Sequence, residues 1–137
     1  EAWTPETFAG VCDRLQHHHA RIAVDAADLQ DLRRYLQGRR DFFLRLLENP
    51  ALLEHESFTD LLRAVFHLTE ELERRDDFAG LPASDVRHLT VDIERVYRLL
   101  AREWLAYMEY LQKNYPYLFS LAMRSNPFDE TASPVVR

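Results

Sequence analysis

Apolar residues recur every three or four positions along most of the chain, which is the spacing of one face of an α-helix. The first stripe follows a helix-start signal, because Thr4 is a good cap and Pro5 suits the first helical position. The stripe runs from Phe8 through Leu15 to Ile22. We expect this first helix to end near Val24.

A second stripe begins at Asp28 and stops at Asn49, directly before Pro50. Gly38 lies inside it, where glycine costs about 1 kcal/mol relative to alanine. We therefore expect a kink or a break near Gly38. Residues 50–56 predict a short connector with one helical turn.

The third stripe gives the clearest helix, with Ser57 as its cap and Leu72 near its end. Residues 76–83 then contain Gly80 and Pro82, which are typical of a loop.

The fourth stripe starts after a second candidate cap, Ser84, and extends to Asn114. Pro116 then begins a short fifth helix over residues 117–124. Residues 127–137 show no period and predict a disordered or extended tail.

These elements predict an all-α fold: an up-and-down helical bundle of four main helices plus a short C-terminal helix, in a single domain of residues 1–126. At 1.5 Å per residue, the fourth helix is longer than its neighbours by several turns. Its projecting end is apolar and aromatic. Either the first and fifth helices cover that end, or a second copy of the chain does, and we expect a homodimer. The interface residues would be Trp104, Tyr107, Met108, Tyr110, Leu111, Tyr115, Tyr117 and Phe119.

Composition narrows the function classes. The chain carries 17 basic and 23 acidic residues, a formal charge of −6, which disfavours binding to nucleic acid. Its one cysteine, Cys12, excludes an internal disulfide. No apolar run reaches the length of a transmembrane helix, so we expect a cytoplasmic domain. The chain begins at Glu1 without a methionine, and we expect a module of a longer polypeptide.

Positive charge concentrates on the second predicted helix. It suggests an anion contact through Arg33, Arg34 and Arg40. The preferred alternative is a solvated helix face, on which neighbouring aspartates balance the arginines.

No pattern for nucleophilic catalysis or phosphate binding appears. Three isolated glycines cannot build a phosphate loop, and Cys12 lies on an apolar stripe where cysteine is typically a small buried residue. We therefore expect no enzymatic activity and no cofactor.

Metal-ligand patterns are incomplete. A di-iron bundle needs Glu-x-x-His pairs on facing helices, and the nearest match is a single Asp85-x-x-His88. His67 has Glu70 and Glu71 at helical ligand spacing, yet each glutamate is followed four residues later by an arginine. We therefore prefer a structural role for these residues. A metal- or small-ligand-binding bundle that uses His67, Glu71 and His88 is the alternative.

The run His17-His18-His19 does not change this preference. Successive residues on a helix point about 100° apart, so the three imidazoles cannot converge on one ion.

Residues 48–72 and 114–128 resemble uncharacterised helical domains of bacteria and archaea, some of them attached to short ion-channel-like membrane proteins. The resemblance implies a helical fold on the cytosolic side of such a protein, or tethered to the inner face of the membrane, and implies no catalytic residue. Our leading hypothesis is a non-enzymatic assembly or regulatory module of a larger prokaryotic protein. The ligand-sensing half of a transcription regulator is a further alternative.

Overall fold

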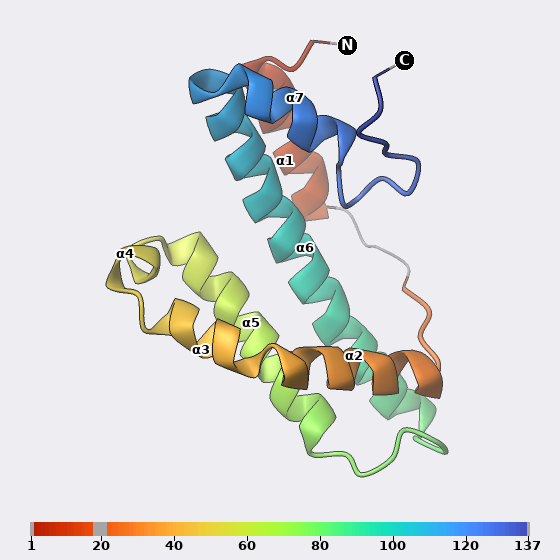
Figure 1. Ribbon diagram of the computed structural model, residues 1–137. Helices are drawn as coiled ribbons and strands as arrows, with labels where there is room; N and C mark the ends of the chain where they lie inside the picture. Colours follow the sequence, from red (N-terminus) through yellow and green to blue (C-terminus); the bar gives the residue numbers. More distant parts are fainter. Residues whose placement is uncertain (1, 18–21, 137) are drawn as a thin grey trace. The chain divides into compact units, whose positions relative to one another are not determined.

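The computed structural model describes residues 2–17 and 22–136, and describes residues 16 and 17 by their backbone alone. Within these ranges it contains seven helices and no strand, so the all-α class is confirmed (Figure 1). The residues form two compact units, which we describe separately: unit 1 comprises 1–18 and 100–137, and unit 2 comprises 19–99. In chain order the helices are α1 (Pro5–His17), α2 (Ala26–Gly38), α3 (Arg40–Leu47), α4 (Pro50–Leu53), α5 (Glu56–Glu73), α6 (Ala83–Asn114) and α7 (Pro116–Arg124).

The second predicted helix is two helices, with the break where the sequence favours one. α2 ends at Gly38 and α3 begins at Arg40. The backbone N–H of Arg39 bonds to the carbonyl of Leu36, which closes α2 with a tight final turn.

The first predicted helix is shorter than expected. α1 ends at His17, and residues 22–25 are not helical. A cap explains the early start of α2: the Asp25 carboxylate accepts the N–H of Asp28 at 2.8 Å, and Asp28 accepts the N–H of Asp25 at 3.0 Å. This reciprocal pair satisfies two N–H groups that the helix start leaves free, so α2 begins at Ala26 rather than Asp28.

Two predicted serine caps are each wrong by two residues, since His55 precedes α5 and Pro82 precedes α6. α5 begins at Glu56, which places Ser57 inside its first turn. α6 begins at Ala83, because the carbonyl of Pro82 accepts the N–H of Val86 at 3.1 Å, which places Ser84 inside the helix. The connector between α3 and α5 contains one helical turn, as predicted.

Unit 2 packs around leucines from three helices. Leu29 of α2, Leu72 of α5 and Leu89 of α6 are almost fully buried, and Phe78 of the α5–α6 connection joins them. The buried Thr69 hydroxyl donates to the Val65 carbonyl at 2.7 Å, so this polar group enters the core without an unsatisfied donor. The leucine core holds α5 against the first half of α6.

Unit 1 has its own core of Phe8, Leu105, Met108 and Leu111. Trp3 and Phe119 pack against it at its edge, and the Gln112 amide donates to the Trp3 carbonyl. The segment after α7 contains turns and residues without regular structure, and the Phe128 ring packs against Trp104 with 5.7 Å between ring centroids. The expectations of one domain over residues 1–126 and of a disordered or extended tail stay predictions.

Candidate metal centre

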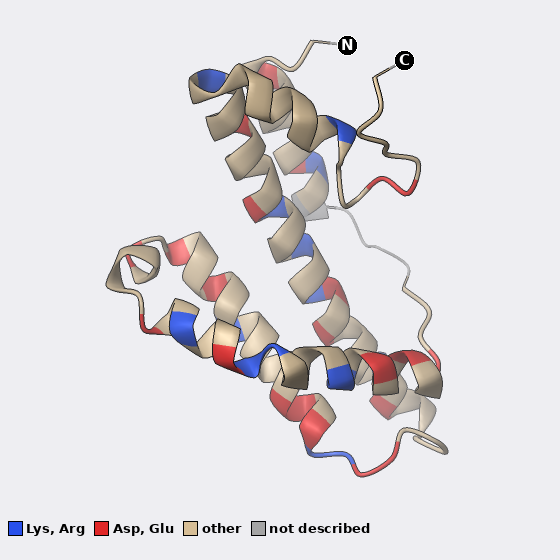
Figure 2. Ribbon diagram, in the orientation of Figure 1, with Lys and Arg blue, Asp and Glu red and all other residues tan. Residues whose placement is uncertain are grey.

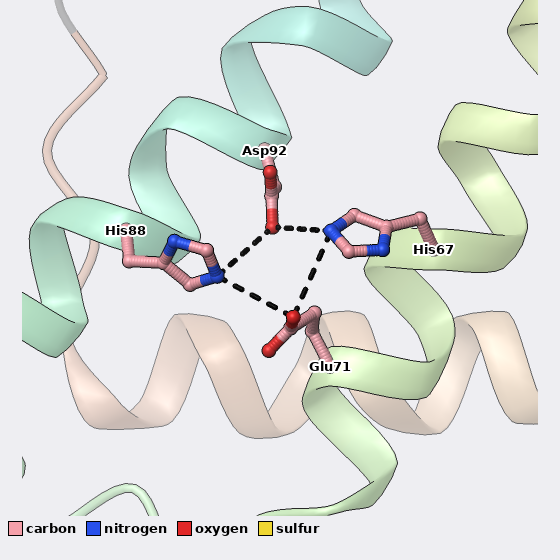
Figure 3. Close-up of side chains that lie close together, drawn as sticks. All are labelled: His67, Glu71, His88 and Asp92. Atoms are coloured by element: carbon pink, nitrogen blue, oxygen red, sulfur yellow. Dashed lines mark ion pairs between the residues drawn. The ribbon is translucent and has the colours of Figure 1, made fainter.

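Four side chains of the types that bind metals lie together in unit 2: His67 and Glu71 on α5, and His88 and Asp92 on α6 (Figure 3). Each helix contributes a histidine and, four residues later, a carboxylate. Residues four apart lie one above the other on a helix face, so each pair points the same way. The chain reverses between α5 and α6, which sets His67 opposite Asp92 and Glu71 opposite His88.

The four inward-facing donor atoms form a ring in which nitrogen and oxygen alternate. His67 Nε2 lies 3.3 Å from Asp92 Oδ2 and 3.7 Å from Glu71 Oε1. His88 Nε2 lies 3.4 Å from Glu71 Oε1 and 3.6 Å from Asp92 Oδ2. All four atoms lie within 4.8 Å of one another.

These separations suit a shared ion better than direct hydrogen bonds. An N–H···O bond typically has its heavy atoms at about 2.9–3.0 Å. Two donors bound to one tetrahedral ion, each roughly 2.0–2.2 Å from it, lie roughly 3.3–3.6 Å apart. The four sides of the ring, at 3.3–3.7 Å, are close to this range, and its two diagonals are at most 4.8 Å.

Asp92 is the most unusual member of the cluster. Its side chain is 4% exposed, and its Oδ2 atom, which faces the ring, has no hydrogen-bond partner. A buried carboxylate oxygen without a donor is costly and therefore rare. A cation in the ring would supply the missing partner.

The outer oxygen of each carboxylate is held by an arginine. Glu71 Oε2 accepts from Arg75 at 2.9 Å, and Asp92 Oδ1 accepts from Arg95 at 2.8 Å. Each carboxylate therefore keeps one oxygen for its arginine and presents the other to the ring. Neither arginine engages the oxygen that faces the ring.

Arg75 is itself fixed by a second carboxylate. Its Nε and Nη2 atoms donate to the two oxygens of Asp85 at 2.8 and 2.6 Å, and its backbone carbonyl accepts from Arg33. Arg75 lowers the pKa of Asp85 and of Glu71 below their ordinary values, chiefly through these hydrogen bonds, with His88 adding to the effect on Glu71. Glu71 is consequently held in the ionised form that binds metals.

The structure brings together all three residues of the alternative metal hypothesis and adds Asp92, which the sequence analysis missed. The di-iron pattern pairs His88 with Asp85, three residues earlier, whereas the pair at the centre is His88 with Asp92, four residues later. The signal that could have found it is the repeat of His-x-x-x-Glu at 67–71 as His-x-x-x-Asp at 88–92.

The three candidate anion-binding arginines all have partners within unit 2. Arg33 lies 4.8 Å over the Phe78 ring as well as bonding to Arg75, and Arg40 pairs with Glu73 at 2.9 Å. Arg34 lies 3.6 Å from Asp31, and basic and acidic residues are interspersed along α2 and α3 (Figure 2). These contacts favour the balanced helix face, and the anion contact stays a prediction.

The predicted interface residues divide into two groups in unit 1. Met108 and Leu111 are core residues, 1% and 4% exposed, and Trp104 and Phe119 pack against that core. α1 and α7 therefore cover part of the aromatic end. The exposed members are four tyrosines: Tyr107, Tyr110, Tyr115 and Tyr117.

Two other sequence features remain, the histidine run and Cys12. His18 and His19 lie outside the described residues, as does the side chain of His17. Cys12 is partly buried on α1 in unit 1, outside the four-residue cluster.

Comparison with known proteins identifies relatives for almost the whole chain. Residues 1–124 match the family described as the C-terminal helical domain of the uncharacterized protein MJ1433. MJ1433 of Methanocaldococcus jannaschii is 50% identical over 129 residues, which cover 94% of this chain and 52% of that protein. The chain thus spans about half the length of this relative. No solved structure matches.

The membrane expectation receives no support. Neither match names an ion channel, and no helix in the described ranges is long and apolar enough to cross a bilayer. The expected helical domain of archaea is confirmed. The chain belongs to the family of the C-terminal helical domain of MJ1433.

Proposed function

We propose that this domain binds one divalent first-row transition ion, with zinc preferred, between α5 and α6. The observation that carries the proposal is the ring of four donor atoms, in which neighbouring donors lie 3.3–3.7 Å apart and Asp92 Oδ2 has no other partner. His67, Glu71, His88 and Asp92 would be the ligands.

The donor chemistry favours this class of ion. Imidazole with carboxylate is typical of zinc and of other divalent transition metals, whereas calcium and magnesium prefer oxygen alone. The ring offers no thiolate, which disfavours copper(I). Four donors complete a tetrahedral shell, and the two carboxylates offset the charge of the ion when both imidazoles are neutral.

Such an ion would cross-link α5 and α6. The ligands come in equal number from α5 and α6, so binding stabilises only the state in which these helices lie together. Both imidazoles are about half-exposed, at 49% and 50%, which gives the ion a route in and out. This supports a non-enzymatic regulatory module whose stability follows the metal supply.

Calorimetric titration of the chelator-treated chain with Zn²⁺ tests the proposal. We expect one ion per chain, and affinity lost in His88→Ala and Asp92→Asn. His55→Ala is the matched control, because His55 precedes α5 and lies outside the cluster; it should bind as the unaltered chain does. Absence of binding, or equal binding by Asp92→Asn, would contradict the proposal.

An assembly role is the second candidate, and the four exposed tyrosines of unit 1 favour it. Exposed aromatic side chains are enriched where proteins contact partners. Light scattering should give a dimer mass for the unaltered chain and a monomer mass for the double variant Tyr107→Ser, Tyr117→Ser. A monomer mass for the unaltered chain would exclude the homodimer.

A further inference from the structure

We propose that Arg95 and Arg75 determine the metal specificity of the centre by limiting each carboxylate to one ligand oxygen. This inference rests on the proposed metal function. It assigns a positioning role to two residues that do not touch the ion.

Both carboxylates are held in the same way, each by an arginine three or four residues later in the chain. Arg95 Nη1 donates to Asp92 Oδ1 at 2.8 Å, while Asp92 Oδ2 faces the ring. Arg75 Nη1 donates to Glu71 Oε2 at 2.9 Å, while Glu71 Oε1 faces the ring. A charge-assisted bond to the outer oxygen opposes the rotation that would turn both oxygens toward an ion.

The consequence is a fixed number of donors. A carboxylate binds a metal through one oxygen or through both, so two free carboxylates and two imidazoles could offer up to six donor atoms. With both outer oxygens engaged, the protein offers four. Four donors suit tetrahedral zinc and cobalt, whereas manganese favours six donors that are largely oxygen.

The two arginines differ in how firmly they are held. Arg75 also bonds to both oxygens of Asp85, and its side chain is 18% exposed. Its replacement would therefore disturb the α5–α6 connection as well. Arg95 is 44% exposed and is the better residue to change.

The test uses Co²⁺ as a spectroscopic probe in the full chain, because its visible absorption is strong in a tetrahedral site and weak at higher coordination. We expect the unaltered chain to give the intense tetrahedral spectrum. Arg95→Met should bind Co²⁺ with a weaker spectrum, because Asp92 can then use both oxygens. Its Zn²⁺-to-Mn²⁺ affinity ratio should fall by about tenfold or more, because loss of an outer partner typically lowers metal affinity by about 10–100-fold and this loss should fall on Zn²⁺. Arg95→Lys, which retains one donor, should recover much of the intensity.

Arg63→Met is the matched control, since Arg63 also pairs with an aspartate three residues earlier, Asp60, away from the centre. It should leave the spectrum and the affinity ratio unchanged. An Arg95→Met chain with the same spectrum and ratio as the unaltered chain would overturn the positioning role. If the unaltered chain bound no Co²⁺ and no Zn²⁺, the proposed metal function itself would fail. Circular dichroism distinguishes both results from loss of the helical fold.

Discussion

At the scale of single residues, the two oxygens of each carboxylate have different partners: one bonds to an arginine and the other faces the ring. The sequence predicts that an arginine four residues after Glu71 would take this glutamate out of a metal site. In the structure Glu71 pairs with Arg75 and also belongs to the ring, because Arg75 bonds to Oε2 while Oε1 faces the histidines. Spacing along a chain identifies partners but does not specify which atom each partner uses.

Asp92 should oppose folding when no metal is bound. Replacement by asparagine removes a buried charge and places an amide donor beside the imidazoles. We expect Asp92→Asn to raise the free energy of unfolding of the metal-free chain by about 1 kcal/mol, since an unmade hydrogen bond of a buried polar group is relieved. Urea denaturation in chelator measures this. Asp60→Asn, at a half-exposed aspartate, should change stability by less than about 0.5 kcal/mol.

The bridge between Arg75 and Asp85 should make stability depend on pH. Arg75 lowers the pKa of Asp85 below its ordinary value of 3.8, so the contribution of the bridge is complete above that pH and is lost as the pH falls toward the lower, folded-state value. At pH 7, Asp85→Asn should lower the free energy of unfolding by about 1.5–3 kcal/mol, the range for hydrogen bonds to charged groups.

Urea denaturation at several pH values should show the gap between Asp85→Asn and the unaltered chain shrinking below about pH 4. Asp31→Asn, which breaks an exposed pair, should show no gap at any pH. A constant gap for Asp85→Asn down to pH 3 would contradict this account of the bridge.

At the scale of elements, hydrophobic periodicity predicts the helices well but not all of their ends. The break between α2 and α3 follows Gly38, because glycine has a much lower helix propensity than the residues around it. The start of α5 differs from the expected one because serine is a good cap in general, while here His55 precedes the helix and makes no side-chain cap hydrogen bond. The pairing of α5 with α6 depends on tertiary packing around Leu72 and Leu89, which no local pattern contains.

Replacing either of two glycines with alanine should change the free energy of unfolding, in opposite directions for the two positions. Gly38 ends α2 with open space around its Cβ position, so Gly38→Ala should raise the free energy of unfolding by about 0.4–1 kcal/mol. Gly80, in the α5–α6 connection, has a φ of 74°, which alanine adopts at a cost of roughly 1–2 kcal/mol. Gly80→Ala should therefore destabilise the chain. Thermal denaturation of both variants tests the contrast, and an equal sign for the two would contradict it.

At the scale of the whole molecule, the two units should respond differently to metal, because the ligands all lie in unit 2. At a free Zn²⁺ concentration 100 times Kd, binding adds about 2.7 kcal/mol to the stability of the folded state that contains the site. Hydrogen exchange should slow most in α5 and in residues 83–99. Equal slowing in α1 and α7 would show that the ion acts elsewhere or that the chain unfolds as one unit.

The local ligand set is the central claim, and X-ray absorption at the zinc edge of the loaded chain tests it most directly. We predict a four-coordinate shell of two imidazole nitrogens and two carboxylate oxygens at about 2.0–2.2 Å. Asp92→Asn should lose this shell. A sulfur at about 2.3 Å would point to Cys12 instead. A shell of three imidazoles, or a spectrum unchanged in Asp92→Asn, would contradict the centre formed by His67, Glu71, His88 and Asp92.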